Sequence, residues 1–279
     1  METAFYRFLE RIGLEKEAVA VVARQDGAQD GAEGGAEAYG ELRRVFDVDE
    51  KGFLAGVGKR GCGFALYYYC RHAYELVGAY RERGISEGVY IDTFADIALW
   101  ERLCLRETGE RGLKETEWLA LHLKMELFKL GRMQYQTIVL AGDVNAGGRA
   151  IRKGSEVYGV HIPRGEAFGD AEREKSYRAA EAFFKRDKMI FRCDSWMLSP
   201  VLKEVLPPES NILRFARDYR VSRLDPANRA AERFVFGKVL EPADLPAAEA
   251  STSLQRAVLR RVKEGRPVGT AEGFYFRGS

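Results

Sequence analysis

Hydrophobic residues follow a helical period through most of the first half of the chain. Their spacing predicts a helix over residues 3–23, although Gly13 weakens it. Residues 25–40 are rich in Gly, Ala, Asp, Gln and Glu and have little to bury, so a mobile loop is expected there. Helical spacing returns over residues 41–130, where an aromatic stripe at 64–80 is typical of helix packing.

The period changes from helical to two-residue near Gly131. Apolar residues at 118–128 predict a helix that ends at this glycine, which suits a left-handed terminating position. Side chains then alternate from Met133 to Leu140, as in a strand. For 279 residues we therefore expect two domains, a helical one over 1–131 and a sheet-containing one over 132–279.

Strand and helix signals mix along the second half of the chain. Turn-forming residues at 143–148 predict a link between the first two strands, and Thr252 with Gln255 predicts a capping box. The expected strands are 133–140, 155–162, 189–193, 219–224, 233–239 and 273–276, and the expected helices are 170–186, 210–215, one starting at Ser199 and one starting at Thr252. The fold class is therefore α+β or α/β, a mixed β-sheet with packed helices.

Composition excludes several classes of function. The 44 basic and 42 acidic residues nearly cancel, so nothing indicates a nucleic-acid partner. No stretch approaches the ~20 apolar residues of a membrane span, and the N-terminus lacks a signal-peptide core. The four cysteines form no Cys-x-x-Cys pair and no zinc-ligand spacing. We expect a cytoplasmic protein without a metal or a disulfide framework.

Three stretches resemble a known family. The first joins Trp118-Leu119 to residues 127–134, and the second is Val160-His161-Ile162-Pro163, followed by a glycine loop and a helix. The third is the segment 193–200, followed by 210–215 and 252–255. Together they resemble a bacterial family of predicted acyltransferases, whose members pair an N-acyltransferase N-terminal domain with a GNAT-like C-terminal domain. The resemblance implies a helical N-terminal domain followed by a GNAT-like mixed sheet.

The resemblance also implies acyl-coenzyme A as co-substrate. In the GNAT superfamily a glycine loop before a helix holds the coenzyme A pyrophosphate with its backbone amides. The matching place here is residues 162–169, where Arg164, Gly165 and Gly169 are the candidate binding residues. The glycine spacing departs from the superfamily pattern, and Glu166 and Asp170 add negative charge.

Acyl transfer to an amine needs a base, donors for the carbonyl oxygen and an acid for the leaving thiolate. His161 is the candidate base, because an unperturbed histidine titrates near pH ~6.5; the alternative is a histidine bonded at a strand end. Tyr219 is the candidate acid, and Ser195 the third catalytic candidate, unless it caps a turn while Trp196 packs in the core. The substrate-binding candidates are Asp194 and Trp196 after a strand and Arg132 and Gln134 at the domain junction.

Two functions stay open from the sequence. The first is an acyl-coenzyme A-dependent N-acyltransferase that acts on a small-molecule amine. The second is a non-catalytic protein that binds a small molecule or a protein and keeps a degenerate GNAT-like fold; the irregular loop at Arg164 to Gly169 favours it. The acyl group, the acceptor and the oligomeric state do not follow from the sequence.

Overall fold

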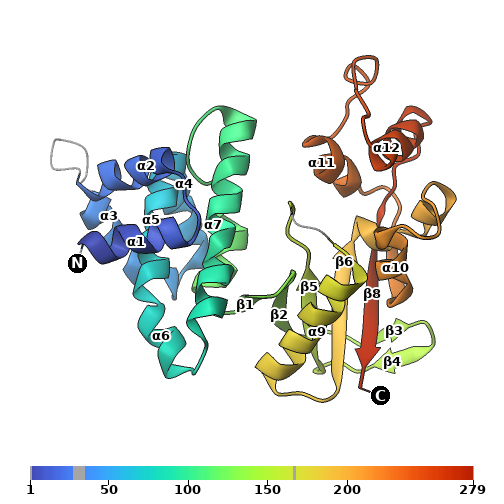
Figure 1. Ribbon diagram of the computed structural model, residues 1–279, viewed down its shortest axis with the longest axis horizontal. Helices are drawn as coiled ribbons and strands as arrows, with labels where there is room; N and C mark the ends of the chain where they lie inside the picture. Colours follow the sequence, from blue (N-terminus) through green and yellow to red (C-terminus); the bar gives the residue numbers. More distant parts are fainter. Residues whose placement is uncertain (1, 28–34, 166–167, 279) are drawn as a thin grey trace. The chain divides into compact units, whose positions relative to one another are not determined.

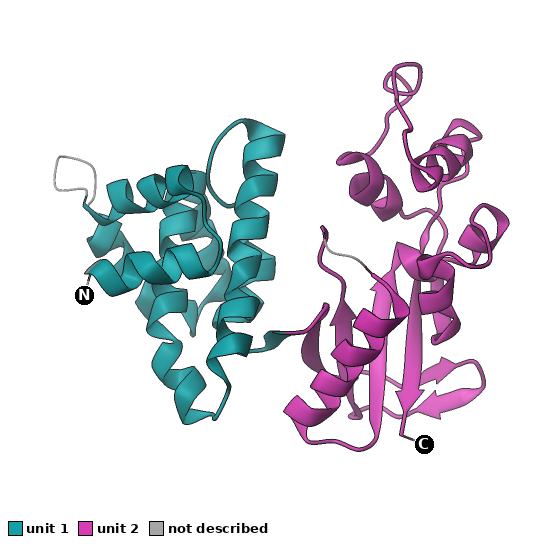
Figure 2. Cartoon of the chain, in the orientation of Figure 1, with its two compact units in different colours: residues 1–129 teal, residues 130–279 magenta. Residues whose placement is uncertain are grey.

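The chain divides into two compact units. The computed structural model describes residues 2–27, 35–165 and 168–278. Unit 1 is residues 1–129 and unit 2 is residues 130–279 (Figure 2). The division falls two residues before the boundary at 131 that the change of period indicates. Within the described ranges, no helix has the length and apolar character that crossing a membrane requires.

Unit 1 is built from helices. They are α1 (Glu2–Arg11), α2 (Lys16–Asp26), α3 (Gly35–Phe46), α4 (Glu50–Lys59), α5 (Gly61–Glu75), α6 (Val77–Glu82), α7 (Glu87–Thr108) and α8 (Thr116–Leu123). The single helix expected over 3–23 is wrong. Gly13 takes a φ of 84°, a left-handed conformation that ends α1 and lets α2 start a new direction.

The mobile loop expected over 25–40 is also wrong at both ends. Residues 28–34 lie outside the described residues, but α2 extends to Asp26 and α3 begins at Gly35. Ala38 and Tyr39 on α3 are buried, and the Tyr39 ring lies 5.1 Å from that of Tyr68. Most residues of the segment are polar, but a few apolar residues lie along one face of α3. A narrow apolar face of this kind is enough for a helix to pack against its neighbours.

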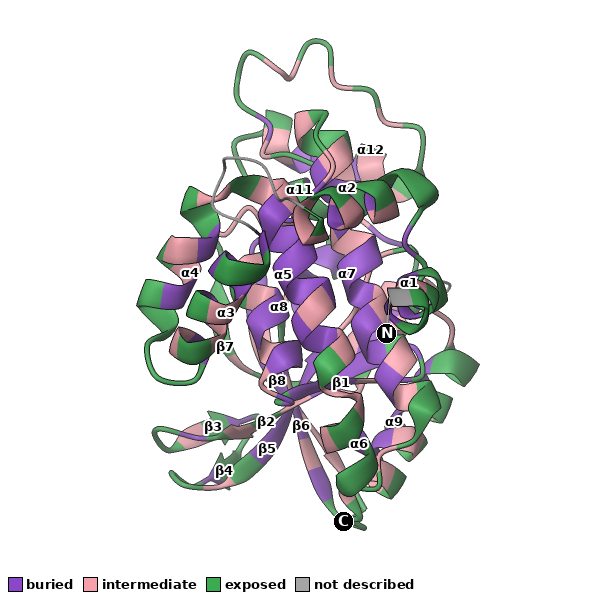
Figure 3. Ribbon diagram, turned by 90° about the vertical axis from the view of Figure 1, so that its left-hand side faces the viewer, coloured by how far each residue is buried: buried purple, intermediate pink, exposed green. Residues whose placement is uncertain are grey.

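Helices α5 and α7 supply much of the core of unit 1. Three consecutive tyrosines of α5, Tyr67, Tyr68 and Tyr69, are at most 1% exposed. Helix α5 is drawn largely in the colour of buried residues, and α7 shows buried segments among intermediate ones (Figure 3). The ring of Tyr68 lies 5.0 Å from that of Phe53, so the stripe is packed among other aromatic side chains, as its spacing indicates.

A buried carboxylate joins α7 to α8. Asp96 on α7 is 5% exposed, and its Oδ2 accepts hydrogen bonds from the indole nitrogens of Trp100 at 3.1 Å and Trp118 at 2.8 Å. The Nε2 of His122 lies 3.2 Å from the same oxygen. A carboxylate can be buried when several donors surround it. Two helices are therefore fixed to each other by one polar group.

Unit 2 is organised around a six-stranded sheet in the order β1-β2-β5-β6-β8-β7 (Figure 1). The strands are β1 (Leu127–Leu130), β2 (Met133–Val139), β3 (Val144–Ala146), β4 (Arg149–Ile151), β5 (Glu156–His161), β6 (Met189–Ser195), β7 (Arg220–Asp225) and β8 (Thr270–Arg277). The helices are α9 (Asp170–Phe184), α10 (Asn211–Arg217), α11 (Ala230–Phe236) and α12 (Ser253–Lys263), with 3₁₀ turns η1 (Trp196–Leu198) and η2 (Pro200–Glu204). The sheet is mixed, since only β5 and β6 pair in parallel and the other described pairs are antiparallel.

Three expectations for unit 2 and for the segment that leads into it are wrong. The helix expected to end at Gly131 stops at Leu123, and Gly131, with a φ of 71°, instead connects β1 to β2. The turn expected at 143–148 is part of the β3–β4 hairpin, and the strand expected over 233–239 is helix α11. Short apolar runs fit a strand and one turn of helix equally well, so tertiary packing decides between them.

The other elements agree with the sequence. Strands β2, β5, β6, β7 and β8 and helix α9 lie where the pattern puts them, within three residues. Ser210 caps α10, accepting a hydrogen bond from the backbone nitrogen of Leu213, and the capping box of Thr252 and Gln255 starts α12. Ser199 begins η2 without a side-chain cap, because its hydroxyl donates to the Val268 carbonyl at 2.6 Å.

The two faces of the sheet are covered differently. Helix α9 covers one face, where Tyr177 packs its ring 4.8 Å from that of Phe191 on β6 (Figure 1). An apolar cluster lies on the opposite face, beside the β3–β4 hairpin. Its buried members are Leu140, Ala146, Ile151, Val157 and Phe274. Side chains alternate between faces along each strand, so the face of every strand residue follows from these two sets.

Among the described residues, the pairing of β5 with β6 stops before the carboxyl ends of the two strands. The paired residues are Tyr158 with Phe191 and Gly159 with Arg192, and β5 and β6 continue for two and three residues beyond them. Each strand stays bound to its other neighbour, β5 to β2 as far as His161 and β6 to β8 as far as Ser195. We call the opening beyond Gly159 and Arg192 the β5–β6 fork.

Replacing Asp96 with alanine should destabilise unit 1. The substitution leaves the indole and imidazole donors of α7 and α8 without their shared acceptor, so the free energy of unfolding should fall by about 3 kcal/mol. Urea unfolding followed by tryptophan fluorescence measures it, because Trp100 and Trp118 are two of the three tryptophans. Asp92→Ala, at a more exposed position on the same helix, is the control. Equal unfolding midpoints for the two variants would contradict the role given to Asp96.

Candidate active site

The fork brings candidate residues together on both faces of the sheet. Pairing of Gly159 with Arg192 places the next residues of each strand in register, with His161 and Asp194 on the face opposite α9. Val160 and Cys193 lie on the α9 face. The backbone edges that face each other across the fork are not joined by strand pairing among the described residues.

His161 lies at the end of β5, opposite Gln134 of β2. Its imidazole Nε2 is buried and comes within 3.4 Å of the place where a side chain would begin at Gly159. Gln134 is 2% exposed, so the two residues form a polar group inside the sheet face. Asp194, on the other side of the fork, holds an ion pair with Arg223 at 3.3 Å.

Tyr219 lies on the α9 face of the fork. It follows α10, and its Cβ lies 3.1 Å from the place where a side chain would begin at Gly273, the partner of Cys193 on β8. Its hydroxyl is hydrogen-bonded to that of Tyr177 at 2.8 Å. Burial raises the pKa of both hydroxyls well above the usual range, so both stay protonated at neutral pH.

The N-terminus of α9 carries charges that offset each other. Gly169 is the residue that precedes the helix, and Asp170 is its first residue. The Asp170 carboxylate lies 2.6 Å from Arg173 Nη1 and 3.1 Å from Arg214 Nε. Two guanidinium groups therefore offset the negative charge at Asp170, with Arg173 shared between Asp170 and Asp218, at a helix N-terminus of the kind that favours anions. The loop positions Glu166 and Ala167 lie outside the described residues.

Two further arginines flank this loop. Arg132 is 6% exposed; its Nη2 donates to the Pro163 carbonyl at 2.7 Å, and its guanidinium lies 5.5 Å from the ring of Phe168. Arg164 donates to the Arg233 carbonyl at 2.8 Å and stacks on Phe234 at 4.5 Å. Gly165 takes a φ of 94°, a conformation that favours glycine. Arg132 therefore fixes the start of the loop, and Arg164 turns toward α11.

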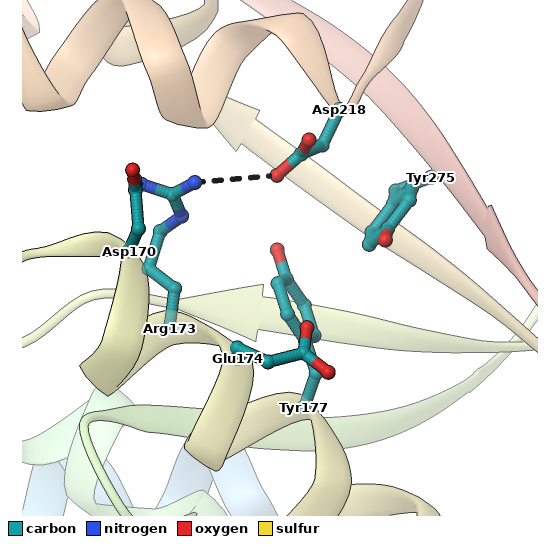
Figure 4. A pocket seen from close by; sticks show the side chains of 6 residues that line it. All are labelled: Asp170, Arg173, Glu174, Tyr177, Asp218 and Tyr275. Carbon is teal, nitrogen blue, oxygen red and sulfur yellow. Dashed lines mark hydrogen bonds and ion pairs between the residues drawn. The ribbon is translucent and has the colours of Figure 1, made fainter.

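A pocket of about 200 Å³ lies beside α9 and α10 (Figure 4). Its lining residues are Asp170, Arg173, Glu174, Tyr177, Asp218 and Tyr275. In Figure 4 the Tyr177 hydroxyl points into the space between Arg173 and Asp218, whose charged groups lie 3.6 Å apart. Burial raises the pKa of Asp218 despite this arginine. The tyrosine pair thus connects a polar pocket to the fork.

The remaining candidates have structural contacts. Ser195 Oγ accepts a hydrogen bond from the backbone nitrogen of Met197 at 3.1 Å and so begins η1. Trp196 is 8% exposed and lies 6.4 Å from Phe234, ring to ring. Burial raises the pKa of the Cys193 thiol, which disfavours a thiolate nucleophile there. Over the described ranges, no group of three or more His, Cys, Asp or Glu side chains is placed to hold a metal ion.

Sequence reasoning missed Tyr177, Arg173 and α11. Tyr177 and Arg173 are four residues apart on one helix, so they share a face, and that spacing was a signal for a joint role. The contact between Arg164 and Phe234 joins residues 70 positions apart, and local sequence contains no signal for it.

Two family models match the chain. Residues 4–125 match the model described as the N-acyltransferase N-terminal domain, and residues 127–275 match the model described as the GNAT-like C-terminal domain. The second match covers more than half of the chain. Among curated proteins, none matches the sequence significantly.

Solved structures with the same fold include several of acyltransferases. One, solved in complex with decanoyl-CoA and teicoplanin, has a TM-score of 0.76 and 22% sequence identity, over 98% of this chain and 87% of that one. Another, of a mutant in complex with octanoyl-CoA, has a TM-score of 0.78 and 21% identity, over 99% of this chain and 88% of that one. At this identity the likeness establishes the fold.

Replacing Arg277 with glutamine should reduce stability most at neutral pH. Its two Nη atoms bind both carboxylate oxygens of Glu174, at 2.6 and 3.0 Å, which lowers the Glu174 pKa to about 2. A carboxyl whose pKa is lowered on folding stabilises the protein above its unfolded pKa of ~4.3, and this stabilisation is lost as the pH falls toward 2. Urea midpoints of R277Q and wild type should therefore differ clearly at pH 6 and converge below pH 3.

Arg178→Gln is the matched control for this prediction. Arg178 also pairs with Glu174, at 2.8 Å, but its side chain is 73% exposed, so its loss should have little effect. A midpoint difference for R277Q that stays constant from pH 6 to pH 2.5 would contradict the prediction.

Proposed function

The chain belongs to the family described as the GNAT-like C-terminal domain, and on that premise we propose that it transfers an acyl group from acyl-coenzyme A to an amine of a small-molecule acceptor. The observation that carries the proposal is the β5–β6 fork. Two parallel strands part after Gly159 and Arg192 and leave facing backbone edges without strand pairing between them among the described residues. An extended chain with amide groups, such as pantetheine, can hydrogen-bond to such an edge as an added strand does.

The charges around α9 fit the phosphates of coenzyme A. The first turn of α9 faces the end of the loop after β5, and Asp170 there is compensated by Arg173 and Arg214. Arg173 is 7% exposed, and its Nε is buried with no hydrogen-bond acceptor among the residues described. A buried guanidinium with an unused donor at a helix N-terminus is suited to an anion. We assign Arg164, Gly165 and Gly169 to the same phosphate-binding region.

We assign the chemical roles to residues on the two faces of the fork. The acceptor nitrogen attacks the thioester carbonyl carbon, the carbon–sulfur bond breaks, and coenzyme A leaves as its thiolate. His161 takes the proton that the nitrogen loses, directly or through a water molecule. Tyr219, with its raised pKa, keeps its proton and stabilises the thiolate by a hydrogen bond rather than by transfer.

The ligands of the structurally similar acyltransferases suggest which acyl donors and acceptors to test first. Those acyltransferases were solved with octanoyl-CoA and decanoyl-CoA, and one also with teicoplanin. We therefore propose medium-chain acyl-coenzyme A as the first donors to test. Asp194 and Gln134 line the His161 face, and with Arg132 and Trp196 they are the proposed acceptor-side residues. We further propose that residues 1–131 and 132–279 act as two domains.

Isothermal titration with coenzyme A and octanoyl-CoA tests the proposal directly. We expect saturable binding, and thiol release once a panel of amines is added. No binding at millimolar concentration would exclude the proposed function.

Replacing His161 with glutamine should slow the reaction without weakening coenzyme A binding. Glutamine keeps a polar group of similar reach but removes the base, so kcat should fall about 100-fold. Thiol release measures kcat, and titration with coenzyme A measures binding. An unchanged kcat would show that His161 is only a strand-end histidine.

Replacing Tyr219 with phenylalanine should lower kcat about tenfold, because the thiolate loses a hydrogen-bond donor. The variant should also lose about 1 kcal/mol of stability with the Tyr177 hydrogen bond. Tyr177→Phe removes the same hydrogen bond and leaves the Tyr219 hydroxyl in place, so it is the matched control. Equal falls in kcat for the two variants would contradict a direct role for Tyr219.

A second function is favoured by one observation. Arg164 is bound to α11 by a hydrogen bond and by stacking, and Tyr219 is 6% exposed, so two candidate residues are already packed within the protein. This arrangement suits a protein that binds a small molecule without turnover. Coenzyme A binding without thiol release, for every donor and amine tried, would support this second function over the first.

A further inference from the structure

Residues 226–269 connect β7 to β8, and we call this segment the insertion. The insertion contains α11 and α12 and leaves and rejoins the sheet at neighbouring places, since a side chain at Gly269 would begin only 2.7 Å from the Asp225 carbonyl. Hydrogen bonds to a buried carboxylate hold the insertion together. Glu232 is 1% exposed and accepts hydrogen bonds from Arg229 at 2.7 Å and from the Leu240 backbone at 2.9 Å.

Helix α11 contacts the residues that follow β5 and the residues that follow β6. Phe234 lies 4.5 Å below the guanidinium of Arg164, which comes after β5, and its ring lies 6.4 Å from that of Trp196, which comes after β6. The carbonyl of the adjacent Arg233 accepts the Arg164 hydrogen bond at 2.8 Å. One short helix thus connects the segments that leave the two strands.

Phe234 is 46% exposed, one of the few large apolar side chains with that exposure in the described chain. An exposed phenylalanine gains little from burial, so its contribution here lies in the stacking contact. The planar guanidinium of Arg164 donates a hydrogen bond to the Arg233 carbonyl. Stacking on Phe234 fixes that plane, which a long arginine side chain would otherwise sample freely.

We propose that Phe234 is a positioning residue that holds Arg164 at the open end of the fork for the phosphates of coenzyme A. The inference rests on the proposed function, because it takes coenzyme A as the ligand. Phe234 does not touch the reacting atoms and acts through Arg164. Affinity for the phosphate-bearing part of the ligand therefore depends on an aromatic ring in the insertion.

Titration of Phe234→Leu with coenzyme A and with pantetheine, which lacks the phosphates, tests this role. We expect the Kd for coenzyme A to rise about three- to tenfold and the Kd for pantetheine to stay unchanged, because only the phosphates use Arg164. Phe234→Trp keeps a stacking ring and should restore the wild-type Kd for coenzyme A. Phe236→Leu, the same substitution two residues along α11, is the control for general damage to the helix.

The outcomes separate the two hypotheses. If wild type binds coenzyme A and Phe234→Leu binds it equally well, the positioning role is overturned and the proposed function stands. Parallel losses for pantetheine and coenzyme A, or the same loss in Phe236→Leu, also overturn it, since they indicate a distorted helix. If wild type binds no coenzyme A, both the function and this inference are overturned.

Discussion

The parting of β5 and β6 after Gly159 and Arg192 is the constraint on which the arrangement of unit 2 depends. Each strand stays paired with its outer neighbour, β2 or β8, beyond the point where the β5–β6 pairing stops. Two of the candidate residues lie on opposite faces of this part of the sheet, His161 on one and Tyr219 on the other.

Charge compensation decides whether that open end suits an anion. In the sequence, Asp170 opposes phosphate binding, because it stands at the first position of α9. In the folded unit, Arg173 approaches it from the same helix and Arg214 from α10. The tyrosine pair, beside Arg173 on the same face of α9, shows a related effect of burial. Burial keeps both hydroxyls protonated, which restricts Tyr219 to donating a hydrogen bond.

A buried polar group of unit 1 also depends on the residues that surround it. Asp96 is buried only because tryptophan and histidine side chains from α7 and α8 converge on one of its oxygens. Asp96 is buried, and the low dielectric of the interior strengthens such hydrogen bonds. The core of unit 1 is therefore specified by a few directional contacts within a large apolar packing.

Periodicity alone determined the strands β2, β5, β6, β7 and β8, helix α9 and the caps of α10 and α12, because these signals are local. It also placed His161 on a strand end and on a definite face. It failed where a short apolar run fits either structure, as for α11 and β1, and where a polar average hides an apolar stripe, as for α3. The opening of the fork, the Tyr177–Tyr219 pair and the seat of Arg164 on Phe234 were decided by the tertiary structure. Each joins segments more than 30 residues apart, and such contacts exist only once the sheet has formed.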